Sequence, residues 1–354
     1  MSTVYAGMDF GWRSFRYEFR TSRNQVLERG GAPATPEALK QVLAKYASTG
    51  RVQVAFEAGT QMHWIDQVIQ ELGYDSYPFH AAHFQMTVKS KSKTDKKDAE
   101  RMAVAAVKQN LPPRVYVPEG VERVLRESLM ERASYQKELN AWGNRLHALA
   151  MGEGVDLGKR SLCQSLANWD TALAALAGTR REAAARQWYT RAVHQFQLLE
   201  ANEEKLRALV SEGEMGEARR RLETIPGIGF WAATGILAWC GPRASRFATG
   251  RQAASYFGLT RSVYESGQIR RPGHITKTGP PLVRKWLTQA AWAFIRSAKG
   301  QASAWGRWQT KMTSRDKDRR KKATIALARR ILTAAVACLR KETEWDPEVL
   351  KSRR

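Results

Sequence analysis

Four acidic residues stand at positions where they could bind divalent cations. Asp9 ends one apolar run, Glu57 ends a second, and Asp95 and Asp98 begin a stretch with a helical pattern. Carboxylate oxygens are the ligands that Mg²⁺ and Mn²⁺ prefer. Two such ions about 4 Å apart can activate an attacking oxygen and neutralise the leaving one in phosphoryl transfer. The four acids therefore predict a metal site that cuts or joins nucleic acid.

The net charge of the chain indicates a polyanionic partner. The 354 residues include 58 Lys and Arg against 34 Asp and Glu, a formal net charge of +24 at pH 7. This excess favours nucleic acid as the partner, although a ribosomal or membrane-surface protein can be equally basic. The 12 Trp residues offer stacking surfaces for unpaired bases, while any single one can equally be a core residue.

Cysteine spacing and hydropathy predict the compartment. None of Cys163, Cys240 and Cys338 belongs to a C-x-x-C pair, so neither a zinc ribbon nor a disulfide framework is indicated. The N-terminus lacks the basic and apolar regions of a signal peptide, and the longest apolar run, Phe230–Cys240, is too short to span a bilayer. We expect a cytoplasmic protein with no membrane partner.

The pattern of residues 1–115 predicts the elements that would position the acids. Strands are expected at 3–9, 14–20, 24–29, 52–57 and 74–79, with helices at 35–48 and 61–72. Antiparallel strands followed by alternating helices and strands are typical of an α/β domain with a mixed sheet. Residues 1–115 are therefore predicted to form an α/β catalytic domain.

The acids fall at informative places in these elements. Asp9 and Glu57 each end a predicted strand, where side chains project from the sheet edge toward a crevice. Asp95 and Asp98 share one helix face if Thr94 caps the helix, although acids near a helix N-terminus also simply complement its dipole. The order strand-Asp, strand-Glu, helix-Asp is that of an RNase H-like nuclease core.

Two mostly helical regions are predicted to follow. Residues 116–215 contain long charged helical stretches at 121–147 and 180–210, which predict an antiparallel arm or coiled coil, with an ordinary helical bundle as the alternative. Residues 216–354 predict a helical domain. Its expected helices lie at 230–240, 251–257, 281–298 and 323–341, and a Gly- and Arg-rich loop is expected at 258–280.

Two segments of this last domain suggest contacts to phosphates. Gly227 and Gly229 predict a helix-hairpin-helix-type turn, in which backbone N–H groups can approach a phosphate, although a plain helix–helix turn has the same pattern. The basic run at 315–322, which includes Arg319 and Arg320, is either a phosphate-tracking segment or a solvated face.

The acidic motifs resemble those of a known family. Residues 5–9, 54–59 and 93–99 are similar to the three motifs of the IS110 family of DEDD transposases, which are recombinases with a RuvC-like N-terminal domain. The third motif is the most specific, because its K-T-D-x-x-D-A pattern is nearly complete. Gly59 and Thr60 stand in exchanged order, and Trp12 and Arg13 occupy a stretch where the family commonly has a Lys.

The resemblance continues through the C-terminal domain and implies a nucleophile. Residues 251–259, 265–267 and 273–279 are similar to the family's pattern, in which a Ser before Gly attacks the DNA. Ser266 would then hold the DNA end as a phosphoserine ester, with Ser262 of the same loop as the alternative. A Ser before Gly is otherwise an ordinary turn residue. The nearby residues expected to stabilise the phosphorane charge are Arg270, Arg271 and Lys277, with His274 as a possible proton carrier.

The resemblance also implies the biological role. It implies a site-specific recombinase of an insertion sequence in a bacterium or archaeon, guided by a bridge RNA that pairs with donor and target DNA. It further implies dimers or tetramers, with the acids of one subunit meeting the serine of another. Two alternatives stay open. One is a Mg²⁺-dependent endonuclease of the Holliday-junction type without a covalent serine step, and the other is a non-catalytic nucleic-acid-binding protein.

Overall fold

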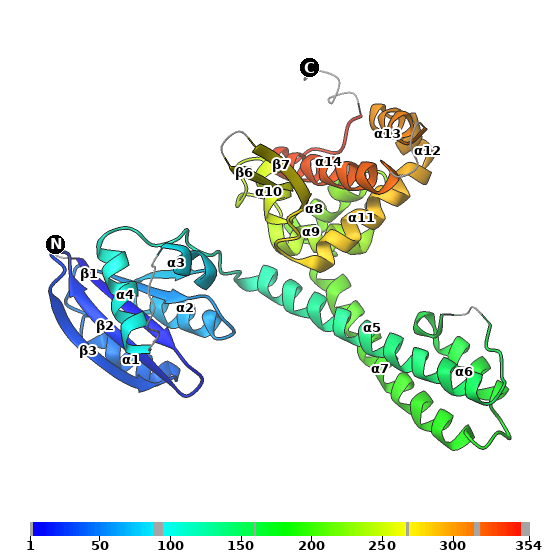
Figure 1. Ribbon diagram of the computed structural model, residues 1–354, viewed down its shortest axis with the longest axis horizontal. Helices are drawn as coiled ribbons and strands as arrows, with labels where there is room; N and C mark the ends of the chain where they lie inside the picture. Colours follow the sequence, from blue (N-terminus) through cyan, green and yellow to red (C-terminus); the bar gives the residue numbers. More distant parts are fainter. Residues whose placement is uncertain (1–2, 88–94, 159–160, 267–268, 315–318, 348–354) are drawn as a thin grey trace. The chain divides into compact units, whose positions relative to one another are not determined.

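The computed structural model describes residues 3–87, 95–158, 161–266, 269–314 and 319–347 (Figure 1). Within these ranges, the side chains of Asp95, Ser266 and Arg270 lie outside the description. The chain divides into two compact units, Met1–Pro118 and Glu119–Arg354. The second unit holds both the helical arm and the C-terminal region, so the three-domain division at 115 and 215 stays a prediction.

The first unit contains a five-stranded mixed sheet. Its strands are β1 (Thr3–Phe10), β2 (Ser14–Thr21), β3 (Val26–Pro33), β4 (Arg51–Glu57) and β5 (Asp75–Phe79), in the order β3-β2-β1-β4-β5. The first three strands form an antiparallel meander, whereas β1 pairs with β4, and β4 with β5, in parallel. The predicted mixed α/β sheet is confirmed.

Helices cover both faces of this sheet. They are α1 (Pro36–Ala44), α2 (Met62–Glu71), α3 (Ala81–Thr87) and α4 (Asp95–Val107). The hydroxyl of Thr35 caps α1 by accepting a hydrogen bond from the Ala38 backbone N–H, as the Thr-Pro start predicts. Residues of α1 and α2 pack on the face that holds Met8 and Phe56, and residues of α3 and α4 pack on the face that holds Ala55.

Gly7 lets α4 lie directly on β1. A Cβ atom at Gly7 would lie 2.2 Å from the Ala99 carbonyl oxygen and 2.3 Å from the Ala103 backbone nitrogen. No side chain fits at that distance, so the helix backbone rests against the strand only because this residue is glycine. This contact sets the distance of α4 from the sheet. Ala99, which makes the contact, directly follows Asp98 in the chain.

Substituting Gly7 tests how firmly this contact holds the helix. We expect Gly7→Ala to destabilise the first unit by about 1–3 kcal/mol, because the added methyl group must push α4 away from β1. Gly59→Ala is the matched control, since a Cβ there meets no atom within 4 Å. The check is the urea midpoint of each variant. Equal midpoints for Gly7→Ala and Gly59→Ala would contradict this account of the packing.

The second unit begins with a long helical arm. Its elements are α5 (Gly120–Gly152), the short 3-10 helix η1 (Leu162–Gln164), α6 (Leu166–Ala175) and α7 (Glu182–Leu209). Arg132 pairs with Glu203, and Glu153 pairs with Arg180, so α5 and α7 run antiparallel along each other (Figure 1). The two long helices are therefore confirmed, whereas α6 was not predicted.

The rest of the second unit packs around one buried helix. Its elements are α8 (Gly213–Glu223), α9 (Phe230–Cys240), α10 (Gly250–Tyr256), β6 (Arg261–Ser266), β7 (Ile269–Ile275), α11 (Pro281–Arg296), α12 (Ala298–Ala302), α13 (Ala304–Ser314) and α14 (Arg319–Lys341). In α9 every residue from 232 to 240 is buried, which explains its apolar sequence. Within the described ranges, no helix combines the length and the apolar character needed to cross a membrane.

Two predictions for this region need correction. The stretch expected to be a Gly- and Arg-rich loop contains an antiparallel hairpin of β6 and β7, because its polar strands hide the apolar alternation that indicates a strand. Helix α14 begins at Arg319 instead of Ala323, so Arg319 and Arg320 belong to its first turn. Lys and Arg are good helix formers, so a helix start predicted from the spacing of apolar residues comes too late in the chain.

The cysteines of the chain are free thiols. Burial raises the pKa of the Cys240 thiol to about 12 and that of Cys338 to about 11. Both thiols therefore stay protonated at neutral pH, and they pack as apolar side chains in the core of the second unit. Cys163 is partly exposed in η1.

Candidate catalytic site

Asp9 and Glu57 lie beside each other at one edge of the sheet. The parallel register of β1 and β4 pairs Met8 with Phe56, and the two acids are the next residues of their strands. Side chains alternate between the faces of a strand, so both acids belong to the face of Tyr5 and Ala55, which α4 covers. Both acids are half-buried.

The first turns of α4 reach the same edge. Ala106 and Gln109 lie near Thr3 at the start of β1, whereas Ala99 lies against Gly7, so α4 runs antiparallel to β1. Two strand residues beyond Gly7 span about 7 Å, which corresponds to roughly four or five helical residues. On β1, this distance of about 7 Å leads from Gly7 to Asp9. On α4, the same distance leads from Ala99 back to the first turn of the helix, which carries Asp95 and Asp98.

Asp98 is held by a local ion pair. Its carboxylate lies 2.9 Å from the guanidinium of Arg101, and its side chain is 21% exposed. Among the side chains that the structure describes, which exclude that of Asp95, no three acids, histidines or cysteines are gathered closely enough to hold a metal. Asp9, Glu57 and Asp98 are all described, so these three carboxylates are not gathered as a metal site, although each is an oxygen ligand of the kind that Mg²⁺ prefers.

A network of charges ties α4 to the sheet beside Asp98. Buried Glu18 on β2 binds Arg20 at 2.5 Å and Arg29 at 2.6 Å, and both arginines reach Glu100 of α4 at 3.5 and 3.4 Å. A buried carboxylate bound by two guanidiniums is costly to disrupt. The sequence did not predict this network, because the alternation of β2 does not show which helix covers its charged positions.

The candidate nucleophile ends the first strand of the hairpin. The register of β6 and β7 pairs Ser266 with Ile269, Glu265 with Arg270 and Tyr264 with Arg271. The backbones of Arg270 and Arg271 therefore lie one and two pairs from Ser266. The side chain of Arg271 is exposed.

The neighbouring polar residues of the hairpin have structural contacts. The hydroxyl of Ser262 donates a hydrogen bond to the His274 carbonyl oxygen, at 3.1 Å, and so joins the two strands. Lys277 follows the hairpin with a φ of 55° and an exposed side chain. Its backbone N–H donates to the Gly258 carbonyl, at 3.3 Å, which fixes the end of the hairpin against α10.

The two glycines of the predicted phosphate-binding turn have different surroundings. Gly227 has a φ of 85°, and a Cβ there would lie 2.2 Å from the Ala290 carbonyl oxygen of α11. Gly229 is exposed at the N-cap of α9, and a Cβ there would meet nothing within 4 Å. Gly227 therefore has a packing role in the core, whereas the backbone at Gly229 is open to solvent.

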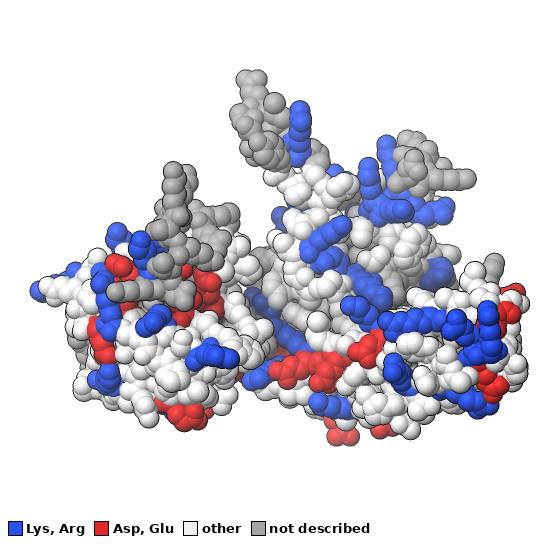
Figure 2. Space-filling model, turned by 60° about the horizontal axis from the view of Figure 1, so that its bottom comes forward, with Lys and Arg blue, Asp and Glu red and all other residues white. Residues whose placement is uncertain are grey.

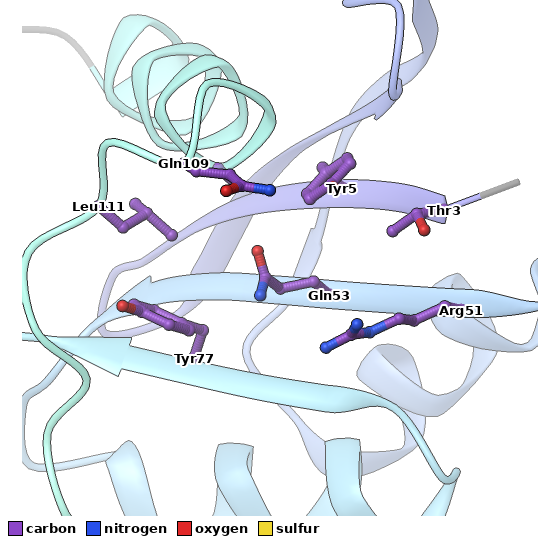
Figure 3. Close-up of a pocket in the computed structure, with 8 residues that line it drawn as sticks. Thr3, Tyr5, Arg51, Gln53, Tyr77, Gln109 and Leu111 are labelled. Atoms are coloured by element: carbon purple, nitrogen blue, oxygen red, sulfur yellow. The ribbon is translucent and has the colours of Figure 1, made fainter.

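A pocket of about 230 Å³ lies at the other end of the sheet (Figure 3). Tyr5 of β1, Gln53 of β4 and Tyr77 of β5 line it, and Arg51 stands at the start of β4. Asp75 binds both Arg51, at 3.2 Å, and Gln53, at 2.9 Å. Because the pocket is near the beginning of β1 and β4, it is separate from the edge that carries Asp9 and Glu57.

Basic side chains are scattered over the surface. On the face drawn in Figure 2, Lys and Arg are spread over both compact units. Arg319 and Arg320 are exposed in the first turn of α14, where the helix dipole is also positive. Cations gathered at a positive helix end repel one another, so phosphate binding there would relieve the repulsion.

Comparison with known proteins identifies the class as transposases. Residues 6–152 match the DEDD model of IS110 transposases, described as a transposase, and residues 219–305 match a model described as "Transposase IS116/IS110/IS902 family". The two matches span about two thirds of the chain, one over the acids and the other over the hairpin. The chain belongs to the IS110 family of transposases, and it is a DNA transposase.

Similar bacterial proteins carry the same description. A probable family 20 transposase of Pseudomonas aeruginosa is 27% identical over 297 residues, 83% of this chain and 86% of the relative. The putative transposase y4rJ of Sinorhizobium fredii is 28% identical over 319 residues, 81% and 78% of the two chains. The transposase for insertion sequence element IS1111A of Coxiella burnetii is 25% identical, covering 78% and 74%.

Proposed function

We propose that this transposase cuts and rejoins DNA with a metal-binding acidic site and a serine nucleophile. The observation that carries the proposal is the parallel pairing of β1 and β4, which ends one residue before Asp9 and Glu57. With Asp95 and Asp98 of α4, these residues would complete an RNase H-like, RuvC-like catalytic domain. The cytoplasm of a bacterium is the compartment that fits such an enzyme.

The chemistry divides between the two compact units. The four acids would hold Mg²⁺ or Mn²⁺, which supplies positive charge to the phosphate oxygens. The Ser266 hydroxyl would lose its proton and attack phosphorus, forming an Oγ–P ester while the DNA oxygen leaves and is protonated. Arg270, Arg271 and Lys277 would stabilise the added negative charge. A hydroxyl of the second DNA end would then displace the serine and complete strand exchange.

The family resemblance supports an oligomer with composite sites. The acids belong to the first compact unit and Ser266 to the second. A dimer or tetramer is proposed in which the acids of one subunit meet Ser266 of another, with the antiparallel arm as a contact between subunits. On this arm, Met130 and Met151 are 54% and 78% exposed, which supplies apolar surface for such a contact.

A bridge RNA is the proposed guide to donor and target DNA. The formal net charge of +24 supports binding to RNA backbones as well as to DNA. Arg319, Arg320 and the open backbone at Gly229 are the proposed phosphate contacts outside the hairpin.

Sequencing of bound RNA tests this guide. The protein is purified from cells that carry the non-coding DNA that flanks its gene, and the RNA bound to it is sequenced. We expect one structured RNA from that flanking DNA, enriched far above cellular RNA. Only random cellular RNA would contradict RNA guidance, and it would leave the acidic site and the serine to be tested separately.

A further inference from the structure

Trp12 is a large apolar side chain held outside the fold. It stands in the turn between β1 and β2, and it is 86% exposed. The neighbouring aromatic residues behave in the opposite way, because Phe10 stacks on the fully buried Phe15 with ring centroids 4.8 Å apart. The core therefore accepts the aromatic side chains on both sides of this turn and leaves the indole of Trp12 in solvent.

The turn that carries Trp12 is firmly anchored. The Gly11 backbone N–H donates to the Ser14 carbonyl at 2.9 Å, and the side-chain amide of Gln61 donates to the Gly11 carbonyl at 3.0 Å. The Ala34 backbone N–H donates to the Arg13 carbonyl at 3.0 Å. Because these three hydrogen bonds already order the backbone of the turn, binding of a partner by the indole costs little backbone conformational entropy.

The position of Trp12 relates it to the acids. Trp12 is the third residue after Asp9, so their Cα atoms lie within about 10 Å of each other. Both residues belong to the same edge of the sheet. A ligand stacked on the indole would therefore be close to a phosphate held by Asp9 and Glu57.

The charges around Trp12 indicate what the ligand is. The turn from Phe10 to Arg16 carries Arg13 and Arg16, both exposed, and no acidic residue. An exposed aromatic face on a segment that also carries two exposed cations suits an unpaired base with its phosphates, because every base has a face that can stack. A purely apolar protein partner would gain nothing from the two arginines.

We propose that Trp12 is a stacking platform for an unpaired base beside the phosphate on which the acids act. Its place near that phosphate rests on the proposed function, whereas its affinity for unpaired bases does not. Trp12 is thus a positioning residue, which keeps the DNA strand separated at the acidic edge and sets the register of the strand.

Binding to single-stranded DNA tests the platform without any cleavage. Full-length protein is titrated with oligo(dT) and with a duplex of equal length, in EDTA. We expect Trp12→Ala to weaken oligo(dT) binding roughly 5- to 150-fold, the loss of one stacked base, with duplex binding unchanged. Trp12→Phe should recover most of the affinity. Trp292→Ala is the matched control, because Trp292 is 37% exposed on α11 and should leave binding unchanged.

Photo-crosslinking locates the contact on the chain. Oligo(dT) that contains 5-iodouracil should crosslink to the peptide with Trp12 in the wild type and in an Asp9→Asn variant, even if neither protein cleaves DNA. Equal oligo(dT) affinity of wild type and Trp12→Ala, with no crosslink at Trp12, would overturn the proposal. A DNA-free oligomer that Trp12→Ala dissociates in sedimentation would also overturn it, since the indole would then bind another copy of the chain.

Discussion

Replacing Asp9 by Asn should lower the rate of DNA cleavage by at least about 10³-fold. The variant keeps the shape of the side chain and removes the negative charge that would hold a divalent cation, and cation stabilisation contributes several kcal/mol to phosphoryl transfer. Folding should change little, because Asn has nearly the same size and shape as Asp and can still accept a hydrogen bond. The measurement is single-turnover cleavage of donor DNA, with binding measured in parallel.

The matched control is the same substitution at the other end of the sheet. Asp75 begins β5, where it binds Arg51 and Gln53, so Asp75→Asn removes a charge at a distance from the acidic edge. We expect cleavage within a few-fold of the wild-type rate. EDTA should stop wild-type cleavage, and added Mg²⁺ should restore it. Cleavage by Asp9→Asn at the wild-type rate, or cleavage that persists in EDTA, would refute the metal site.

Replacing Ser266 by Ala should abolish strand exchange and the covalent bond between protein and DNA. The hydroxyl is the group that would attack phosphorus, and water has no means of holding the DNA end for rejoining. The variant should still bind DNA and Mg²⁺, because the acids lie in the other compact unit. The check is recombination of a plasmid that carries both donor and target sites.

Ser262→Ala provides the control within the same hairpin. It removes the hydrogen bond to the His274 carbonyl, a loss of about 1 kcal/mol of stability, and it should leave recombination largely intact. If Ser266→Ala continues to cut DNA while Ser262→Ala does not, Ser262 is the nucleophile. If both variants cut normally, the protein acts as a metal-dependent nuclease without a covalent step.

Local patterns predicted the sheet and the strand-end acids well. The apolar runs before Asp9 and Glu57 predict strands, and the alternation of helices and strands predicts a mixed sheet, but the parallel pairing of β1 with β4 comes from the structure. The arm was also predictable, because α5 and α7 are long and free of proline. These features depend on residues close together in the chain.

Long-range contacts explain what the sequence left hidden. Gly7 and Ala99 touch across more than 90 residues, and no local pattern shows that α4 rests on β1. The ion pairs of Glu18 and Glu100 with Arg20 were hidden for the same reason. Gly227, which the sequence suggests as a phosphate contact, packs against α11. Its φ of 85° required glycine in either case, so spacing alone did not distinguish the two roles.

The exposure of Trp12 is also a result of tertiary structure. The alternation of β1 and β2 predicts that Phe10 and Phe15 face the core, and it leaves the residues of the turn unassigned. The sequence marked Trp12 and Arg13 only as a departure from the family's usual Lys. The hydrogen bonds of Gly11 with Ser14 and Gln61 hold the backbone of this turn, so the exposed indole of Trp12 stands on an anchored segment.

The most direct test of the central claim is to map the covalent bond between DNA and protein. Wild-type protein reacts with donor DNA in Mg²⁺, the reaction is stopped with denaturant, and the peptides are examined by mass spectrometry after nuclease digestion. The account predicts a nucleotide attached to the peptide with Ser266, and its loss in Asp9→Asn. Cleaved DNA with free ends and no modified peptide would contradict a serine recombination mechanism and identify the acidic site as that of a nuclease.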